Sequence, residues 1–245
     1  AAVAAARAVG YENAGTVEFI VDENRKFYFL EMNTRLQVEH PITEFVTGLD
    51  LVRLQIEIAA GEKLPFSQND LIQRGHAIEC RIYAEDPAND FLPDTGEILL
   101  AQSPHMPNVR VDTGIETGDS ISTFYDPMIA KLITYGSTRD AAIQQMQLAL
   151  REYVILGLTT NIAFLQDVFA HEAFRAGKTP TNFIPQHLSD WQPATLDHEE
   201  LDFALIASAL HELHTQPNSS TTGNAAGDLY SPWNQTDRFR IGESR

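Results

Sequence analysis

The chain has 245 residues, of which 17 are Lys or Arg and 34 are Asp or Glu, so its formal net charge is −17. Its hydrophobic fraction of 43% is typical of a globular protein with one large or two modest domains, and its acidity disfavours nucleic acid as a partner. The sequence has no apolar run near the roughly 20 residues that span a bilayer, and its single Cys80 cannot form an internal disulfide, so we expect a soluble protein without a membrane partner.

The first part of the sequence predicts a helix, a hairpin and a second helix. The Ala-rich start, followed by Gly10, is typical of the second half of a helix, which suggests a chain that begins inside a domain. Strands are expected at Thr16 to Val21 and at Phe27 to Met32, on either side of a polar turn. Asp50 is expected to cap a helix that ends at Gly61.

The remainder mixes strands with helices and predicts an α+β fold. Strands are expected at Ala77 to Tyr83, Glu97 to Leu100, Val109 to Val111 and Met128 to Tyr135. Helices are expected from a capping box at Ser137 and Asp140 to about Ile155, from Asn161 to Ala170, and from about Leu196 to His214. The polar and small residues of 216–228 predict a flexible linker.

Two acidic side chains are predicted to face each other across the hairpin. If the strands pair about the centre of the turn, Glu18 lies opposite Glu31 and Thr16 lies opposite Asn33. Facing carboxylates repel unless a cation, a shared proton or an arginine lies between them. Mg²⁺ or Mn²⁺ would satisfy both carboxylates and the Asn33 amide oxygen, while a solvated face beside Lys or Arg is the alternative. The same alternation predicts an apolar face formed by Val17, Phe19, Val21, Tyr28, Leu30 and Met32.

Arg35, Gln37 and Glu39 alternate directly after the hairpin and bring an anion-binding fork, an amide and a potential base into one small region. This set suits a small oxyanion. The run Glu-Met-Asn-Thr-Arg-Leu-Gln-Val-Glu-His-Pro at 31–41 resembles the signature of biotin carboxylases, the ATP-grasp component of acyl-CoA carboxylases. The resemblance continues to about residue 190, and the run Phe183 to His187 is similar to methylcrotonyl-CoA carboxylase α subunits.

The resemblance implies that Glu18 and Glu31 bridge the metal ions on ATP and that Asn33 supports them. The metal would be Mg²⁺ or Mn²⁺, and it would neutralise charge on the transferred phosphoryl group.

The resemblance also implies a bicarbonate site formed by Arg35, Gln37 and the backbone of Val38, in which Arg35 also takes part in catalysis. Glu39 matches the general base of the family. Arg110 matches the arginine that stabilises the enolate of biotin, and a surface arginine on an edge strand is the alternative for this residue.

A domain order and a reaction are implied as well. Residues 1–61 would end an ATP-grasp domain, 62–190 would form a mostly antiparallel C-terminal domain flanked by helices, 191–228 would form a helix and linker, and 229–245 would begin a carboxylase-linking domain. ATP and bicarbonate would carboxylate biotin on a separate carrier domain, for use by a carboxyltransferase subunit. The full subunit is expected to form a homo-oligomer in the cytoplasm, or in the mitochondrial matrix of a eukaryote.

Two alternatives stay open at this point. One is another ATP-grasp ligase, such as a relative of carbamoyl phosphate synthetase, and the other is a non-catalytic assembly module. The family carries its Gly-rich lid and its ATP-binding lysines upstream of the hairpin, and this sequence lacks them, so the isolated chain is expected to be inactive.

Overall fold

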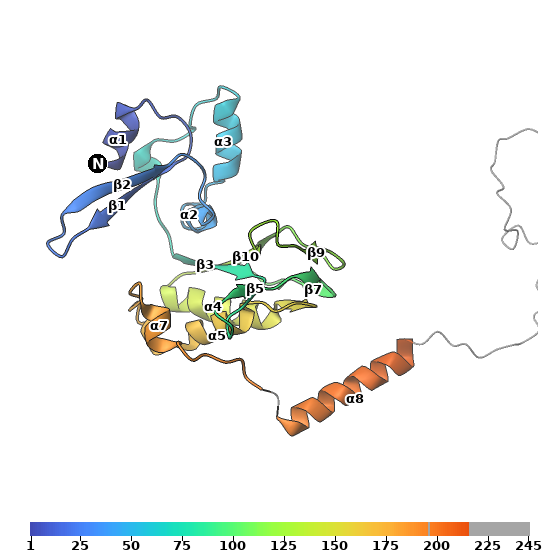
Figure 1. The fold of residues 1–245 in the computed structure, drawn as a ribbon. Coiled ribbons are helices and arrows are strands. Elements are labelled where there is room, and N and C mark those ends of the chain that lie inside the picture. Colours follow the sequence, from blue (N-terminus) through green and yellow to red (C-terminus); the bar gives the residue numbers. More distant parts are fainter. Residues whose placement is uncertain (196, 216–245) are drawn as a thin grey trace, which may run out of the picture. The chain divides into compact units, whose positions relative to one another are not determined.

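A computed structural model describes residues 1–195 and 197–215, which fall into two compact units, Ala1–Pro193 and the part that follows Ala194. The first unit begins with five elements (Figure 1). They are α1 (Ala2–Ala8), β1 (Thr16–Val21), β2 (Phe27–Asn33), α2 (His40–Thr47) and α3 (Leu51–Ala59). Asp50 caps α3 as expected, because its side chain accepts a hydrogen bond from the Arg53 backbone N–H at 2.8 Å.

The hairpin confirms part of the predicted register and corrects the rest. Glu18 pairs with Glu31, and Thr16 pairs with Asn33, as expected. A bulge follows Glu18, so that Phe19 pairs with Phe29 and the register beyond it is shifted by one residue. The predicted apolar face is therefore wrong in its second half. The rings beside Phe19 are those of Phe27 and Phe29, with edge-on centroid distances of 5.4 and 6.4 Å, in place of Tyr28 and Leu30.

A three-stranded antiparallel sheet in the order β3-β10-β8 forms the centre of the rest of the unit. Its strands are β3 (His76–Tyr83), β10 (Met128–Gly136) and β8 (Val109–Thr113), and they follow a 3₁₀ turn at Gln68–Asp70. Short strands pair around it: β4 (Glu85–Asp86) with β5 (Leu92–Pro93), β6 (Gly96–Glu97) with β9 (Ser120–Ile121), and β7 (Leu100–Gln102) with β11 (Val154–Leu156). The single strand expected at 97–100 is thus divided between β6 and β7.

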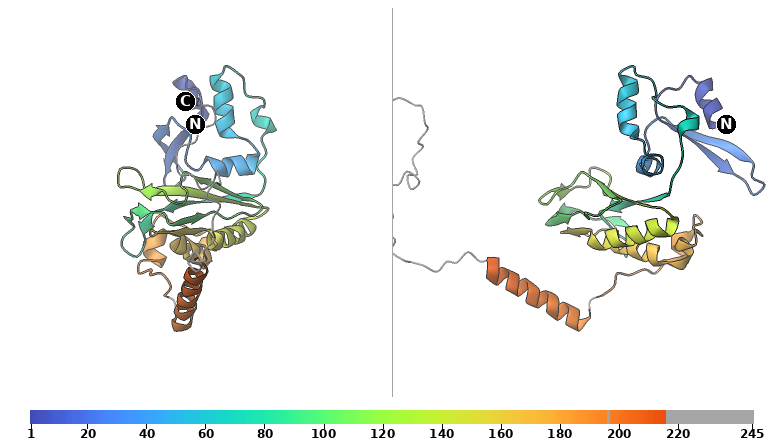
Figure 2. Two further views of the ribbon diagram at one scale, coloured as in Figure 1. Left: turned by 90° about the vertical axis from the view of Figure 1, so that its right-hand side faces the viewer. Right: turned by 180° about the vertical axis from the view of Figure 1, so that it is seen from behind.

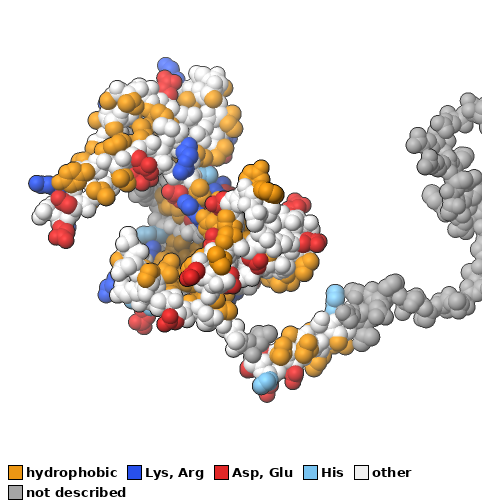
Figure 3. Space-filling view, viewed as in Figure 1, with side chains coloured by type: hydrophobic (Ala, Val, Ile, Leu, Met, Phe, Trp, Pro, Cys, Tyr) orange, Lys and Arg blue, Asp and Glu red, His pale blue; other side chains and the backbone are white. Residues whose placement is uncertain are grey.

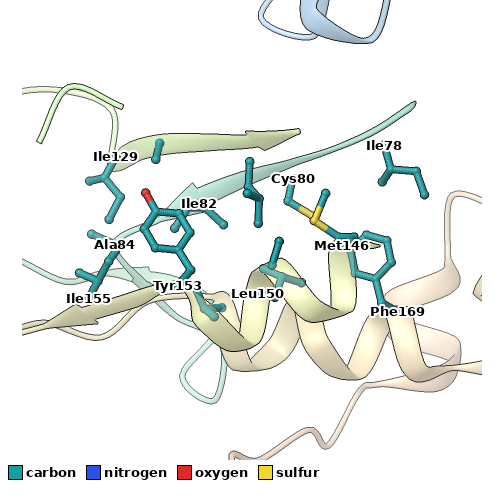
Figure 4. Close-up of a cluster of buried hydrophobic side chains, with 14 of the residues drawn as sticks. Ile78, Cys80, Ile82, Ala84, Ile129, Met146, Leu150, Tyr153, Ile155 and Phe169 are labelled. Atoms are coloured by element: carbon teal, nitrogen blue, oxygen red, sulfur yellow. The ribbon is translucent and has the colours of Figure 1, made fainter. Parts of the chain in front are cut away.

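Helices cover one face of this sheet, and α2 lies against the opposite face (Figures 1 and 2). The covering helices are α4 (Arg139–Glu152) and α5 (Ile162–Ala170), while α6 (Glu172–Arg175) and α7 (Phe183–His187) pack beside α5. Apolar side chains of β3, such as Cys80 and Ile82, point toward Met146 and Leu150 of α4 and form the core (Figure 4). Burial of this layer removes apolar surface from water and stabilises the unit.

The helix predicted at 137–155 begins and ends differently. Thr138, rather than Ser137, is the N-cap, because its hydroxyl accepts a hydrogen bond from the Ala141 N–H at 3.2 Å. The helix ends at Glu152, and Val154 lies in β11 because the chain turns there to pair with β7.

The second unit contains α8 (His198–Thr215), close to the helix predicted at 196–214. The predicted linker at 216–228 and the predicted domain start at 229–245 lie outside the described residues. No helix within the described ranges is long and apolar enough to cross a membrane. The four domain ranges expected from the sequence stay predictions.

Candidate active site

The open end of the hairpin brings together the three predicted metal ligands. The Asn33 amide donates hydrogen bonds to Glu18 Oε1 at 2.7 Å and to Glu31 Oε1 at 3.4 Å, so it lies between the two facing carboxylates. Two carboxylates and an amide oxygen are a donor set that Mg²⁺ accepts together with substrate phosphates. A third acidic, His or Cys ligand is not found near them in the described part of the chain, so such an ion would need oxygens from a ligand.

The loop after β2 presents hydrogen-bond donors next to these carboxylates. Arg35 Nη1 donates to the Leu36 carbonyl at 3.2 Å and to Gln37 Oε1 at 3.4 Å, and its side chain is exposed. The Gln37 Nε2 atom is buried and has no hydrogen-bond partner among residues 1–195 and 197–215. A buried amide donor without an acceptor is costly, and a bound oxyanion would satisfy it. Arg35 and Gln37 therefore fit an anion site.

Glu39 lies at the start of α2 and is held by an arginine from the sheet. Its Oε2 atom forms an ion pair with Arg81 Nη2 at 2.9 Å, and about half of each side chain stays exposed, 54% for Glu39 and 42% for Arg81. The neighbouring His40 ring nitrogen Nδ1 lies 2.8 Å from the Gln37 carbonyl oxygen, which makes His40 a local structural residue. The predicted base thus has a cationic partner and remains open to solvent on one side.

Further contacts fix α2 and the loop before it on the sheet. Lys131 Nζ donates to the Val38 carbonyl oxygen at 3.1 Å and pairs with Asp112 Oδ2 at 3.2 Å. The Phe45 ring stacks on Tyr135 with a centroid distance of 6.0 Å. These contacts set the position of the backbone that carries Val38 and Glu39.

Arg110 lies in a denser set of ion pairs. Its Nη1 atom donates to Glu44 Oε2 at 2.6 Å, and its Nε and Nη2 atoms donate to the Asp112 carboxylate at 2.6 and 2.9 Å. Hydrogen bonds to Asp112, and then those to Glu44, raise the pKa of Arg110. Burial opposes ionisation of Asp112, but hydrogen bonds from Arg110 and Lys131 outweigh it and lower the pKa of Asp112. The Arg110 guanidinium is therefore engaged by two carboxylates on three of its nitrogens.

Sequence reasoning singled out Arg110 and did not single out Arg81 or Glu44. Strand alternation could have found Arg81, because it shares the face of β3 that lies away from the core residues Cys80 and Ile82. The pairing of Glu44 with Arg110 joins residues 66 positions apart, and no local pattern marks it.

The first unit thus supplies four chemical functions from the hairpin, the loop after it, the start of α2 and the sheet. The hairpin supplies carboxylates for a hard cation, and the loop supplies anion donors. The start of α2 supplies a solvent-accessible carboxylate, and the sheet supplies guanidinium and ammonium groups. Acidic and basic side chains lie side by side where α2 meets the sheet (Figure 3). These groups are the kind that bind a phosphorylated ligand with its cation, bind a small oxyanion and accept a proton.

Comparisons with known proteins agree with this arrangement. A sequence model of the biotin carboxylase C-terminal domain matches residues 79–186, and one of the carbamoyl-phosphate synthase L chain ATP-binding domain matches residues 1–67. The α subunit of mitochondrial methylcrotonoyl-CoA carboxylase from Rattus norvegicus is 48% identical over 238 residues, which are 93% of this chain and 33% of that protein. Biotin carboxylase 2 of Bacillus subtilis is 53% identical over 187 residues, which are 76% of this chain and 42% of that protein.

The fold is also that of solved relatives. The biotin carboxylase domain dimer of Hydrogenobacter thermophilus 2-oxoglutarate carboxylase, in complex with MgADP, ADP and bicarbonate, matches with a TM-score of 0.76 at 44% identity, over 79% of this chain and 43% of that one. The present chain spans 33% of the length of its methylcrotonoyl-CoA carboxylase relative. Both parts of the site, the hairpin with α2 and the sheet, fall within the matched regions. The chain is therefore similar to biotin carboxylases over most of its length.

Proposed function

We propose that this chain forms part of a biotin carboxylase, an ATP-dependent ligase that carboxylates biotin on a carrier domain by way of carboxyphosphate. The observation that carries the proposal is the segment from Glu18 to Glu39. In it, two facing carboxylates are followed along the chain by an arginine-paired carboxylate and by a buried amide donor that has no acceptor among residues 1–195 and 197–215. The similarity to biotin carboxylases along this segment supports it.

In the proposed first step, bicarbonate lies against Arg35, Gln37 and the backbone of Val38. Glu39 accepts the bicarbonate proton, and the resulting oxyanion attacks the γ-phosphorus of ATP. The bond between this phosphorus and the bridging oxygen breaks, which yields carboxyphosphate and ADP. Donor groups that already point at the anion lower the barrier because they need no reorganisation.

Glu18 and Glu31, with Asn33, would hold Mg²⁺ or Mn²⁺. When bound, the ion supplies positive charge next to the transferred phosphoryl group. The donor set of the hairpin fits this role, since the two carboxylates would otherwise repel each other directly across the strands.

A positive charge is also needed where biotin becomes an enolate. Carboxyphosphate breaks down to CO₂ and phosphate, the phosphate takes the ureido proton of biotin, and the resulting enolate attacks CO₂ to form carboxybiotin. The resemblance implies Arg110 for this role. The contacts favour Arg81 instead, because Arg81 lies beside Glu39 and is 42% exposed, whereas Arg110 is bound by Glu44 and Asp112. We propose Arg81 as the enolate-stabilising group and Arg110 as the residue that holds α2.

The proposed reaction requires a biotin carboxyl carrier domain and a carboxyltransferase subunit as partners. The similarity to acyl-CoA carboxylase α subunits supports both. The solved relative is a dimer, which supports self-association of the full subunit. Several similar proteins are mitochondrial, and we propose the mitochondrial matrix for a eukaryotic source and the cytoplasm otherwise.

The test measures ATP cleavage by the full-length gene product that contains these 245 residues, with bicarbonate and free biotin each added or omitted. We expect cleavage that needs bicarbonate and is stimulated by biotin, and we expect Glu39→Gln to abolish it. Glu57→Gln, at a partly exposed position of α3 where the carboxylate pairs with Arg53, is the matched control and should keep the activity. Cleavage that depends on an amine donor instead of biotin would overturn the proposal. Formation of carboxybiotin without ATP cleavage would also overturn it.

A further inference from the structure

One face of the sheet collects charged side chains around the predicted base. The strand register places Arg81 opposite Lys131 and places Lys131 opposite Asp112, so these three side chains share a row across β3, β10 and β8. Glu79 precedes Arg81 by two residues on β3 and therefore projects from the same face. Glu39 approaches this face from the loop before α2, where it pairs with Arg81.

Among the described residues, the ion pairs on this face include every acidic side chain of the group except one. The three cations, Arg81, Lys131 and Arg110, are taken up by three acidic residues, Glu39, Asp112 and Glu44. Glu79 is the fourth acidic residue of the group. Its Oε2 atom is buried and has no hydrogen-bond partner in the described part of the chain. The face is electrically balanced only while Glu79 carries a proton.

The surroundings of Glu79 bring its ionisation into the physiological range. Burial raises the pKa of Glu79 to about 7, against the opposing effect of Lys131 and Arg81, while the negative charges of Glu39 and Asp112 raise it further. These four residues are the charged groups that face it from β3, β10, β8 and the loop before α2. A nearby cation would stabilise an ionised Glu79, and Arg81 lies two residues further along the same strand.

We propose that Glu79 is a positioning residue that competes with Glu39 for Arg81, so that loss of the Glu79 proton loosens the Arg81–Glu39 pair and frees Glu39 to accept a proton from bicarbonate. This inference rests on the proposed function. In the protonated state of Glu79, Glu39 is the carboxylate that Arg81 pairs with, and the Glu39 Oε2 atom is engaged by Arg81. In the ionised state, Arg81 divides its hydrogen bonds between two carboxylates. Bicarbonate-dependent ATP cleavage therefore rises with pH as Glu79 loses its proton.

The test compares pH profiles of bicarbonate-dependent ATP cleavage in the full-length gene product. The unmodified protein is expected to gain activity between about pH 6 and pH 8, around the pKa of Glu79 of about 7. Glu79→Gln cannot ionise and keeps Arg81 on Glu39, so this rise should disappear and the rate at pH 8 should fall roughly twofold, as expected for an exposed ion pair. Glu79→Met, an apolar side chain of similar length, should give the same flat profile and covers the case in which Glu79→Gln folds poorly.

Glu85→Gln is the matched control, because burial also raises the pKa of Glu85, while its charged neighbour is Asp126 instead of the site residues. Its pH profile should match that of the unmodified protein. A merely structural role for Glu79 would lower the rate equally at all pH values and would overturn the inference. An unchanged rise in both Glu79 variants would also overturn it while leaving the proposed function intact. Absence of bicarbonate-dependent cleavage in the unmodified protein would instead overturn the proposed function, and this inference with it.

Discussion

Replacement of Arg110 by alanine should destabilise the first unit more than any other single change in the charged group on the sheet. Glu44 is only 8% exposed, and its two carboxylate oxygens accept hydrogen bonds from the Leu51 N–H at 2.7 Å and from Arg110 at 2.6 Å. Without Arg110, a buried carboxylate loses its cation. Breaking a fully buried pair costs about 3–5 kcal/mol. Arg110 is 37% exposed, so water replaces part of the interaction, and we expect a loss of about 2 kcal/mol.

This loss translates into a measurable shift of the unfolding midpoint. A domain of this size loses about 2–4 °C per kcal/mol, so Arg110→Ala should lower the midpoint by about 4–8 °C in a thermal scan followed by circular dichroism. Arg81→Ala is the matched variant, since it removes an arginine from the same sheet face. The Arg81–Glu39 pair is exposed and is worth about 0.5 kcal/mol, so its removal should lower the midpoint by only about 1–2 °C.

Activity should show the opposite order. At a temperature where both variants are folded, Arg81→Ala should lose biotin-dependent carboxylation almost completely, while Arg110→Ala should keep a larger part of it. Equal midpoints for the two variants would refute the stability argument. A stable Arg110→Ala protein that cleaves ATP but forms no carboxybiotin would return the enolate role to Arg110.

Three further outcomes follow from other parts of the structure. Glu18→Gln and Glu31→Gln should each raise the Mg²⁺ concentration needed for half-maximal ATP cleavage and slow that cleavage about 10- to 100-fold, whereas unchanged metal titrations would contradict a shared ion. Cys80 should react with a thiol reagent only after addition of denaturant, because burial raises the pKa of its thiol, and rapid labelling of the folded chain would contradict its place in the core. Gly157→Ala should lower the free energy of unfolding, measured in urea, by more than about 2 kcal/mol, because φ is +110° and a Cβ atom would meet the Glu97 carbonyl oxygen. Gly177→Ala should lower it less, because φ is +70° and the space around Gly177 is open.

The sequence predicted the elements of the fold well where a local pattern decides them. The alternation in β1 and β2 gave the pairing of Glu18 with Glu31, and Asp50 was a recognisable cap. The bulge after Glu18 could not be predicted, since one additional residue in β2 leaves the composition of the strand unchanged. Its effect is large, because every side chain beyond it changes face. Large apolar side chains of the hairpin, Phe27 and Tyr28 among them, are exposed, and hydrophobic atoms are visible along it (Figure 3).

The site also has a part that the local sequence predicts and a part that it does not. The metal ligands and anion donors lie in one continuous segment, and that segment is what the resemblance identified. The cations that face it come from residues 42 to 93 positions away, such as Arg81 for Glu39 and Lys131 for Val38, and only the packing of α2 on the sheet brings them together. A sequence motif does not show which arginine of the sheet will contact it in the folded chain. The choice between Arg81 and Arg110 therefore required the structure.

The sheet has a chemical role in this arrangement beyond that of a scaffold. Glu39 belongs to the segment of the hairpin and α2, but its counter-ion belongs to β3, and the backbone of Val38 is bound by Lys131 of β10. Lys131 is only 13% exposed, so its ammonium group is stable there because Asp112 and the Val38 carbonyl replace water. Without Lys131, Asp112 would pair with Arg110 only, and the Val38 carbonyl in the loop that carries Glu39 would lose its hydrogen bond. Lys131→Met should therefore raise the bicarbonate KM, as the Val38 backbone shifts, while Arg110 and Glu44 still hold α2 in place. An unchanged KM with a lowered unfolding midpoint would show that Lys131 only stabilises the sheet.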